Sequence, residues 1–269
     1  DLDLNENSNL VFKSSATQTA IFGIVGDCTN TNIIYSGTGT SQGKATVERF
    51  IPAKRAFRGL TAPVISTTSI NDNWQEGASN NVPDYAQNQD PNPGYGTHIT
   101  GNDPTNNGFD NTATDNPSLF TYNNDTQTWV TITNTDVNTF SIDYPYFMLV
   151  RGDRSINTQM NAPTPTNTTL RASGQLHLCD FGFPFQLADD AGQFNLVGNP
   201  YQSPIDMSLV LADATNVNPV SYQVFDPTIN DNGAYVVVDV SNGSSVPASS
   251  ANEYLQPGQS AFVYTANNG

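Results

Sequence analysis

The sequence has little positive charge. Its 269 residues include 9 Lys and Arg against 25 Asp and Glu, which gives a formal net charge of −16, and only 13% of the residues are charged. An average globular domain carries about 25% charged residues. Nucleic acids and anionic membranes attract clustered basic side chains, so this balance argues against either as a partner.

Long apolar runs and helical periodicity are also missing. No run of about 18 consecutive apolar residues occurs, so membrane insertion through a spanning helix is excluded. Short alternating or wholly apolar runs recur instead between Asn-Gly, Asp-Pro, Asn-Pro and Pro-Gly pairs, which form turns. This pattern predicts an all-β fold. The clearest expected strands are Leu10–Lys13, Thr46–Ile51, Trp129–Ile132, Tyr146–Val150, Tyr235–Val240 and Ser260–Tyr264, and the one expected helix is Asp206–Ala214.

Cysteine and histidine are scarce as well. Cys28 and Cys179 either form one disulfide or remain two buried thiols, and their spacing does not decide between these. Two histidines cannot build a three-His zinc site, and no His-Glu-x-x-His, Gly-x-Ser-x-Gly or phosphate-loop motif is present. We therefore predict no catalytic residue and expect that the chain is not an enzyme.

A weak internal duplication organises the sequence. Phe57–Pro63 and Phe194–Pro200 each place an aromatic residue six positions before a proline. Each segment is followed by an aromatic-rich hairpin and then by an apolar strand. The duplication predicts two related β-sandwich or jelly-roll-like lobes. The expected domains are residues 1–45, N-terminal strands that form a solenoid-like cap; residues 46–170, the first lobe with a long insertion at 77–117; and residues 171–269, the second lobe.

The insertion at 77–117 is rich in Asn, Asp, Gly and Pro and contains no Lys or Arg. Loops of this length inside a compact domain are usually functional or disordered. Aromatic faces beside Asn and Asp side chains suit a sugar-binding surface, while the simpler alternative is a surface loop whose aromatic side chains pack onto a sheet. The candidate ligand-binding residues are Tyr85, Tyr95, His98 and Phe109.

Five of the nine basic residues, including Lys44, gather at the start of the first lobe. Arg49, Lys54, Arg55 and Arg58 lie close together in the sequence. The structural interpretation is that they brace the junction between the N-terminal strands and the first lobe through bidentate pairs with carboxylates. The functional alternative is a docking surface for an acidic module or an anionic polysaccharide.

Two groups of oxygen-bearing side chains are candidates for a Ca²⁺ site. Asp226, Asn230 and Asp231 lie in one short segment, and Asp103 and Asp110 lie in the insertion. Neither group has the full EF-hand spacing, and turns closed by Asp and Asn side chains explain both without a metal. Ca²⁺ is the only cofactor that the sequence suggests.

Several longer motifs carry a resemblance that spans roughly residues 10 to 269. The motifs are Thr46–Arg58, Ser69–Gly77, Pro93–Gly101, Met148–Arg154, Asn195–Tyr201 and Leu255–Gln259. They resemble segments of large exported surface proteins of gliding and marine bacteria of the Bacteroidetes type. The resemblance implies type IX secretion, with a solenoid region before this module.

These observations favour a non-catalytic structural or adhesive module of a secreted protein, located outside the cell or on its surface. Flanking modules of the same polypeptide, or copies of itself, are then its expected partners. The alternative is a carbohydrate-binding, lectin-like module that uses the insertion, with or without Ca²⁺, and takes glycans as its partners.

Overall fold

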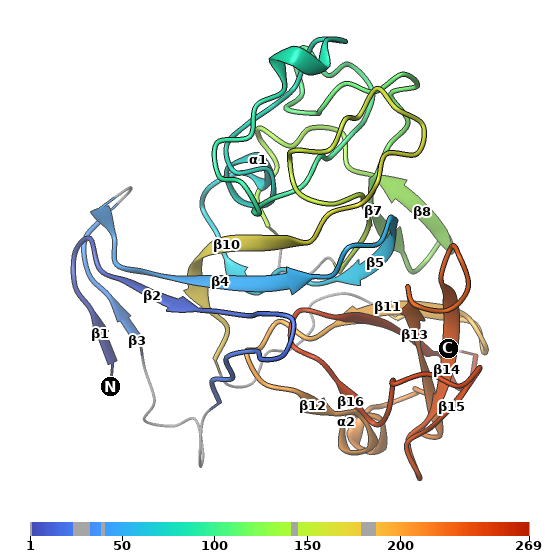
Figure 1. Cartoon of the computed structure of the whole chain (residues 1–269). Helices are drawn as coiled ribbons and strands as arrows, with labels where there is room; N and C mark the ends of the chain where they lie inside the picture. The colour runs from blue at the N-terminus through green and yellow to red at the C-terminus, as the bar shows by residue number, and fades with distance from the viewer. Residues whose placement is uncertain (1, 24–32, 39–40, 141–144, 179–186, 269) are drawn as a thin grey trace.

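A computed structural model describes residues 2–23, 33–38, 41–140, 145–178 and 187–268. The described chain is an all-β structure, as predicted, with two short α-helices beside its sheets (Figure 1). The six expected strands and the expected helix all form, with ends that differ from the predicted ends by at most two residues. None of the helices in the described segments is long and apolar enough to cross a membrane.

The N-terminal strands pair in parallel. β1 (Leu2–Leu4) pairs with β3 (Ile33–Tyr35), and β2 (Asn9–Phe12) pairs with β4 (Lys44–Ile51). β1 and β2 therefore run in the same direction as β3 and β4, their respective partners. Figure 1 shows β1 and β3 at one end of the molecule. The sheet continues beyond β4 in the order β2-β4-β10-β6. β10 is Thr168–Leu176 and β6 is Val64–Ile65.

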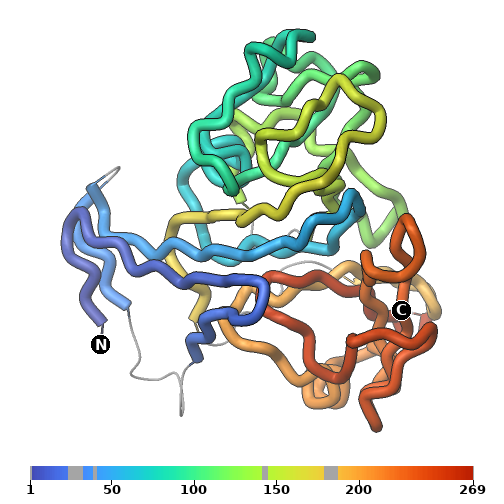
Figure 2. The backbone as a smooth tube through the Cα atoms, viewed as in Figure 1, coloured from blue at the N-terminus to red at the C-terminus, as the bar shows by residue number. Residues whose placement is uncertain are grey.

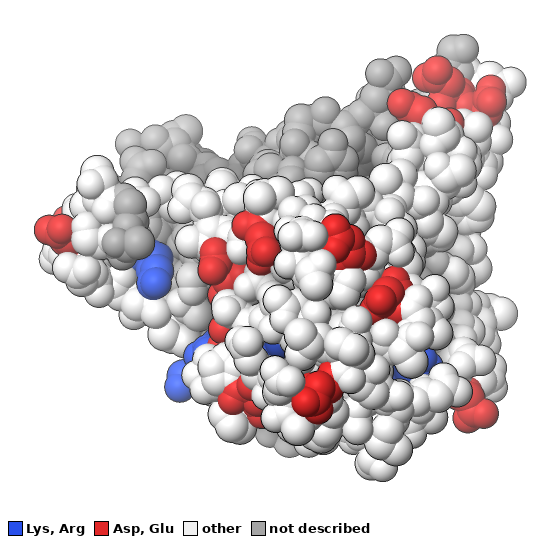
Figure 3. Space-filling view, turned by 90° about the horizontal axis from the view of Figure 1, so that it is seen from above, with Lys and Arg blue, Asp and Glu red and all other residues white. Residues whose placement is uncertain are grey.

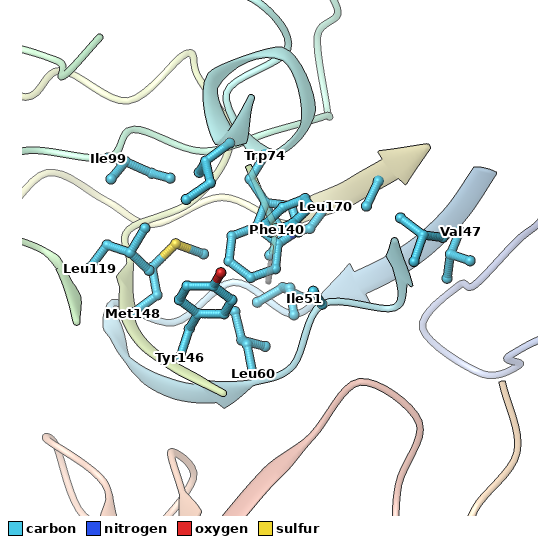
Figure 4. Close-up of a cluster of buried hydrophobic side chains, with 14 of the residues drawn as sticks. Val47, Ile51, Leu60, Trp74, Ile99, Leu119, Phe140, Tyr146, Met148 and Leu170 are labelled. Atoms are coloured by element: carbon cyan, nitrogen blue, oxygen red, sulfur yellow. The ribbon is translucent and has the colours of Figure 1, made fainter. Parts of the chain in front are cut away.

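A second sheet shares a hydrophobic core with the first. In β9, Tyr146, Met148 and Val150 face this core while Phe147 faces the other side, because neighbouring side chains of a strand point to opposite faces. Trp74 and Phe140 complete the core with their rings 4.5 Å apart (Figure 4). The strand order is β5-β9-β7-β8. The bounds are β5 Ala56–Leu60, β7 Leu119–Asn123, β8 Thr128–Thr131 and β9 Tyr146–Val150.

The third sheet has its own core in the C-terminal part of the chain. Its strand order is β11-β17-β13-β14-β15, and a separate pair, β12 with β16, lies next to helix α2. Met207 and Leu211 of α2 pack onto Val224, Val236 and other apolar residues of this sheet. The bounds are β11 Phe194–Gly198, β12 Ile205–Asp206, α2 Met207–Asp213, β13 Ser221–Asp226, β14 Ala234–Asp239, β15 Ser244–Val246, β16 Tyr254–Leu255 and β17 Ser260–Tyr264.

The second and third sheets repeat one arrangement. Strands β5, β9, β7 and β8 follow the same order and the same antiparallel pairing as β11, β17, β13 and β14. Each first strand is followed by a two-residue strand and a short helix, α1 (Ile70–Trp74) or α2. The strands that the internal duplication pairs in the sequence therefore occupy equivalent places in the two sheets.

The two helices are equivalent in detail as well. The side chains of Ser69 and Asp206 cap their N-termini, and Ser69 forms a capping box with Asp72. The first helical N–H donates to the carbonyl of Asn138 in α1, at 2.8 Å, and to that of Glu253 in α2, at 2.9 Å. Helix α1 was not predicted, although the Ser-x-x-Asp pattern at its start is a capping signal.

The repeated sheets face one another through aromatic side chains. The strand registers make Phe57, Tyr122, Trp129 and Phe147 equivalent to Phe194, Phe225, Tyr235 and Phe262, in that order. Contacts between the sheets come in matched pairs: the rings of Tyr122 and Phe262 are 5.0 Å apart, and those of Phe225 and Phe147 are 5.1 Å apart. This reciprocity is that of a two-fold, self-complementary interface.

Candidate functional site

The insertion at 77–117 consists of loops with one short 3-10 helix, η2 (Tyr85–Gln87), and lies at the top of the molecule, beyond α1 (Figure 1, Figure 2). Side-chain amides of α1 and the residue after it hold these loops in place. Asn71 Nδ2 donates to the carbonyl oxygens of Ala78 and Gly108, both at 3.1 Å, and Gln75 Nε2 donates to that of Gly108 at 2.8 Å. The loops are therefore attached to a helix that is itself part of the core.

Asp110 is the centre of the polar interior of the insertion. Its side chain is fully buried and accepts two hydrogen bonds from Arg154, from Nη2 at 2.7 Å and from Nη1 at 3.0 Å. Backbone N–H groups of Asn80, at 2.7 Å, and Ile99, at 3.1 Å, donate to the same carboxylate. Asp110 thus ties both ends of the insertion to the segment after β9.

His98 and Arg154 set the electrostatics of this interior. His98 Nδ1 lies 3.2 Å from Asp110 Oδ1, and the other ring nitrogen, Nε2, lies 3.0 Å from the Arg154 carbonyl oxygen. Burial alone would raise the pKa of the Asp110 carboxyl, but the charges and hydrogen bonds of His98 and Arg154 outweigh it and hold that pKa well below its usual range.

The four candidate ligand-binding side chains do not share one surface. His98 and Phe109 are buried, at 0% and 2% exposure, so neither is presented to a ligand in solution. The Tyr95 ring has the Arg171 guanidinium 4.3 Å from its centre. Tyr85 is 41% exposed, and its hydroxyl donates to the Ser155 carbonyl at 2.7 Å. His98 and Phe109 are therefore corrected as candidates for ligand binding, and of the four side chains only Tyr85 offers an open ring.

The proposed metal ligands are hydrogen-bonded to neighbouring protein groups. The Asp226 carboxylate accepts hydrogen bonds from the Thr228 backbone N–H at 2.7 Å and from the Thr228 hydroxyl at 2.6 Å. This is a turn closed by an Asp side chain, the alternative to a metal site that the sequence allows. Asp103 is exposed and accepts from Thr105 and Asn106 in its own turn. Among the described residues no group of three or more His, Cys, Asp or Glu side chains is arranged to hold a metal.

The other candidate metal ligands have different surroundings and do not form a shared site. Asn230 uses its carbonyl oxygen to accept from Lys54 Nζ at 2.6 Å, and Asp231 is exposed beside it. Asp110 is committed to Arg154, whereas Asp103 faces solvent.

The basic cluster bridges parts of the chain that are distant in sequence, but not through carboxylates. Arg49 Nη2 donates to Gln202 Oε1, and Arg58 donates to the carbonyl oxygens of Phe57, at 3.2 Å, and Lys54, at 3.3 Å. Arg55 is exposed. The ion pairs found in the described segments join Asp110 to His98 and Arg154, and Glu76 to Arg171. The predicted bidentate carboxylate pairs of the cluster are therefore corrected to contacts with an amide and with backbone carbonyls.

The important polar residue that the sequence analysis did not select is Arg154. The insertion contains no Lys or Arg, so a guanidinium or ammonium partner for an acid buried inside it has to come from another segment. Arg154, in the turn that follows the buried strand β9, was the available signal. Cys28 and Cys179, which the sequence allows as either a disulfide or two thiols, lie outside the described residues.

Comparisons with protein families, with characterised proteins and with solved structures find no match to this chain.

Proposed function

We propose that this chain is a non-catalytic structural or adhesive module of a secreted cell-surface protein, whose N-terminal strands continue a parallel β-solenoid. The parallel register of β1 on β3 and of β2 on β4 carries the proposal, because successive solenoid turns stack in this way. The family resemblance supports export by a type IX route and a place outside the cell.

A neighbouring module would pair its own strand with the outer edge of the N-terminal strands. β1 and β2 are the end strands of their sheets, and Leu2 and Val11 on them are each 38% exposed. An edge strand offers unpaired N–H and C=O groups to another strand. The expected partner is a flanking turn of the same polypeptide or the same edge of a second copy.

Self-association of the purified chain tests this proposal. Sedimentation velocity should show association that grows with protein concentration, and the double variant Leu2→Lys/Val11→Lys should sediment as a monomer, since charged side chains on an edge oppose strand addition. The matched control is Val137→Lys/Met160→Lys, which changes two exposed apolar residues outside the strands and should associate as the wild type does. A monomeric wild type, or lysine variants at the edge that still associate, would contradict the proposal.

A carbohydrate-binding role is the second candidate, and Tyr85 is the observation that favours it. Its exposed ring is held by a hydrogen bond beside Asp84 and Gln87, which supplies an aromatic face with polar neighbours. Figure 3 shows the molecule from above as a largely uncharged face with scattered acidic and a few basic side chains, which suits recognition of neutral sugars by hydrogen bonds.

A glycan panel, probed with Ca²⁺ and then with chelator, separates the two candidates. A lectin should retain specific glycans and lose them in the Tyr85→Ala variant, while Tyr254→Ala, which removes a ring of similar exposure elsewhere, should leave binding intact. Retention lost on chelation would point to bound Ca²⁺. If no glycan is retained under either condition, the lectin role is rejected.

A further inference from the structure

A groove of about 340 Å³ lies where segments distant in sequence meet. Its walls come from the N-terminal segment with Ile21, from the end of β4 and from β5, from Pro204 and the end of β13, and from the turn before β17. Its walls are largely apolar, with Leu60, Phe225 and Pro257 among them. A pocket of this kind, apolar with few polar groups, is the usual form of a small-molecule site.

The charged groups in this groove are two arginines, beside the uncharged polar side chains of Ser14, Thr19, Gln256 and Gln259. Arg49 and Arg58 both line it, and among the described residues that line it none is acidic. The net charge of the chain is −16, so two guanidinium groups gathered here without an acid in the wall are unlike the rest of the molecule. The groove is therefore a local positive site on a negative protein.

Arg49 has no carboxylate partner in the described structure. Its Nη2 donates to Gln202 Oε1 and its Nη1 to the Glu48 carbonyl oxygen at 3.3 Å, while its Nε is buried without a hydrogen-bond acceptor. Burial lowers the pKa of this guanidinium to about 10, and no neighbouring acid raises it. A buried cation that is not paired costs free energy, which an anion in the groove would recover.

Arg58 differs from Arg49 in having an acid nearby. Burial lowers its pKa to about 10, and the charge of Asp226 acts in the opposite direction.

Both arginine side chains are held by hydrogen bonds within the protein. Gln202, which accepts from Arg49, is itself fixed because its side-chain amide donates to the Pro63 carbonyl at 2.9 Å. The two cations are thus fixed before any ligand arrives, which reduces the entropy cost of binding.

We propose that this groove binds a carboxylate carried on a compact apolar body, with Arg49 as its main electrostatic partner and the apolar walls around the rest of the ligand. Guanidinium groups suit carboxylates because their donors match the two carboxylate oxygens in geometry. This site goes beyond the proposed structural role, and neither depends on the other.

Binding of cyclohexanecarboxylate to the full chain tests this proposal. Saturation-transfer NMR should detect the carboxylate, titration calorimetry should give its Kd, and the neutral analogue cyclohexanecarboxamide should bind at least about tenfold more weakly because it lacks the charge. Glucuronate, which carries the same charge on a polar ring, should also bind more weakly.

Two variants separate the site from a general charge effect. Arg49→Gln should weaken cyclohexanecarboxylate binding about tenfold or more. Arg151→Gln is the matched control, because Arg151 is similarly buried, has its pKa lowered to about 10 first by burial, and does not line the groove. Its Kd should stay within about twofold of the wild type. Equal affinity for acid and amide, no detected binding, tighter binding of glucuronate, or an Arg49→Gln variant that binds as well as wild type would overturn the proposal.

Discussion

At the scale of single residues, the ion pair of Asp110 and Arg154 stabilises the insertion. Neither side chain is exposed to solvent, so removing one partner leaves the other charge buried and unpaired. The Asp110 carboxylate also accepts backbone N–H bonds from two separate loops. Replacing it therefore affects the whole insertion and not one contact.

We expect the Asp110→Asn variant to lose on the order of 3–5 kcal/mol of unfolding free energy at neutral pH, because Arg154 would stay buried without its partner. Urea unfolding followed by circular dichroism measures this. Asp103→Asn is the control: that carboxylate lies in the same insertion but is exposed, so its loss should cost less than about 0.5 kcal/mol. Equal effects of the two variants would contradict this role of Asp110.

The same carboxylate should make stability depend on acidity. Its pKa is lower in the folded than in the unfolded chain, because His98 and Arg154 outweigh the effect of burial, so its contribution is present above the unfolded pKa of about 3.9 and is lost as the pH falls below it. The unfolding free energy of the wild type should fall more steeply than that of Asp110→Asn below about pH 4. Parallel curves for the two proteins would refute this.

At the scale of elements, the residue that follows β5 approaches the end of β11 closely. Thr61 and Gly198 are equivalent positions of the repeat, and a β-carbon built on Gly198 would lie 1.9 Å from Thr61 Oγ1. The strand register thus requires glycine on one side of this contact.

Gly198→Ala should therefore destabilise the fold by roughly 1–3 kcal/mol, as overpacking does in well-packed interiors. Gly23→Ala is a suitable control, because its added β-carbon meets only ordinary contacts at 3.8 Å. Thermal melting of the two variants measures the difference. A Gly198→Ala protein as stable as wild type would show that the strands separate easily at this point.

At the scale of the whole molecule, the aromatic interface joins the two repeated sheets into one unit. Phe147 and Phe262 hold equivalent places, and each contacts rings of the opposite sheet, with Phe147 5.1 Å from Phe225 and Phe262 5.0 Å from Tyr122. Aromatic pairs contribute beyond their buried area. Neither sheet would keep this face out of water alone.

We expect the two repeats to unfold in one cooperative transition. Both tryptophans, Trp74 and Trp129, lie in the first repeat, so tryptophan fluorescence and far-ultraviolet circular dichroism should give coincident urea curves. Phe262→Ala, in the second repeat, should shift both curves together by about 3–5 kcal/mol. The exposed control Val246→Ala should shift neither by more than about 0.5 kcal/mol. A shift in circular dichroism alone would indicate two independent units.

Particular elements show which parts of the fold can be predicted from the sequence. β9 and β17 were found because a short apolar run between turn residues is a local property of buried strands, whether it alternates as in β9 or is buried throughout most of its length as in β17. The match of the two copies was found because their order of aromatic strands survives in the sequence. Helix α1 was missed, since its five residues are too few to show a helical period.

The sequence by itself determined the class of fold, the positions of the six clearest strands and the repeat, because these follow from local periodicity, turn residues and composition. Only the tertiary structure decided that His98 and Phe109 are buried, that Arg49 binds an amide in place of a carboxylate, and that two aromatic faces meet. The physical reason is that burial and pairing depend on which distant segments come together. Hydrogen bonds such as that between Arg49 and Gln202 join residues far apart in the chain, and no local pattern encodes them.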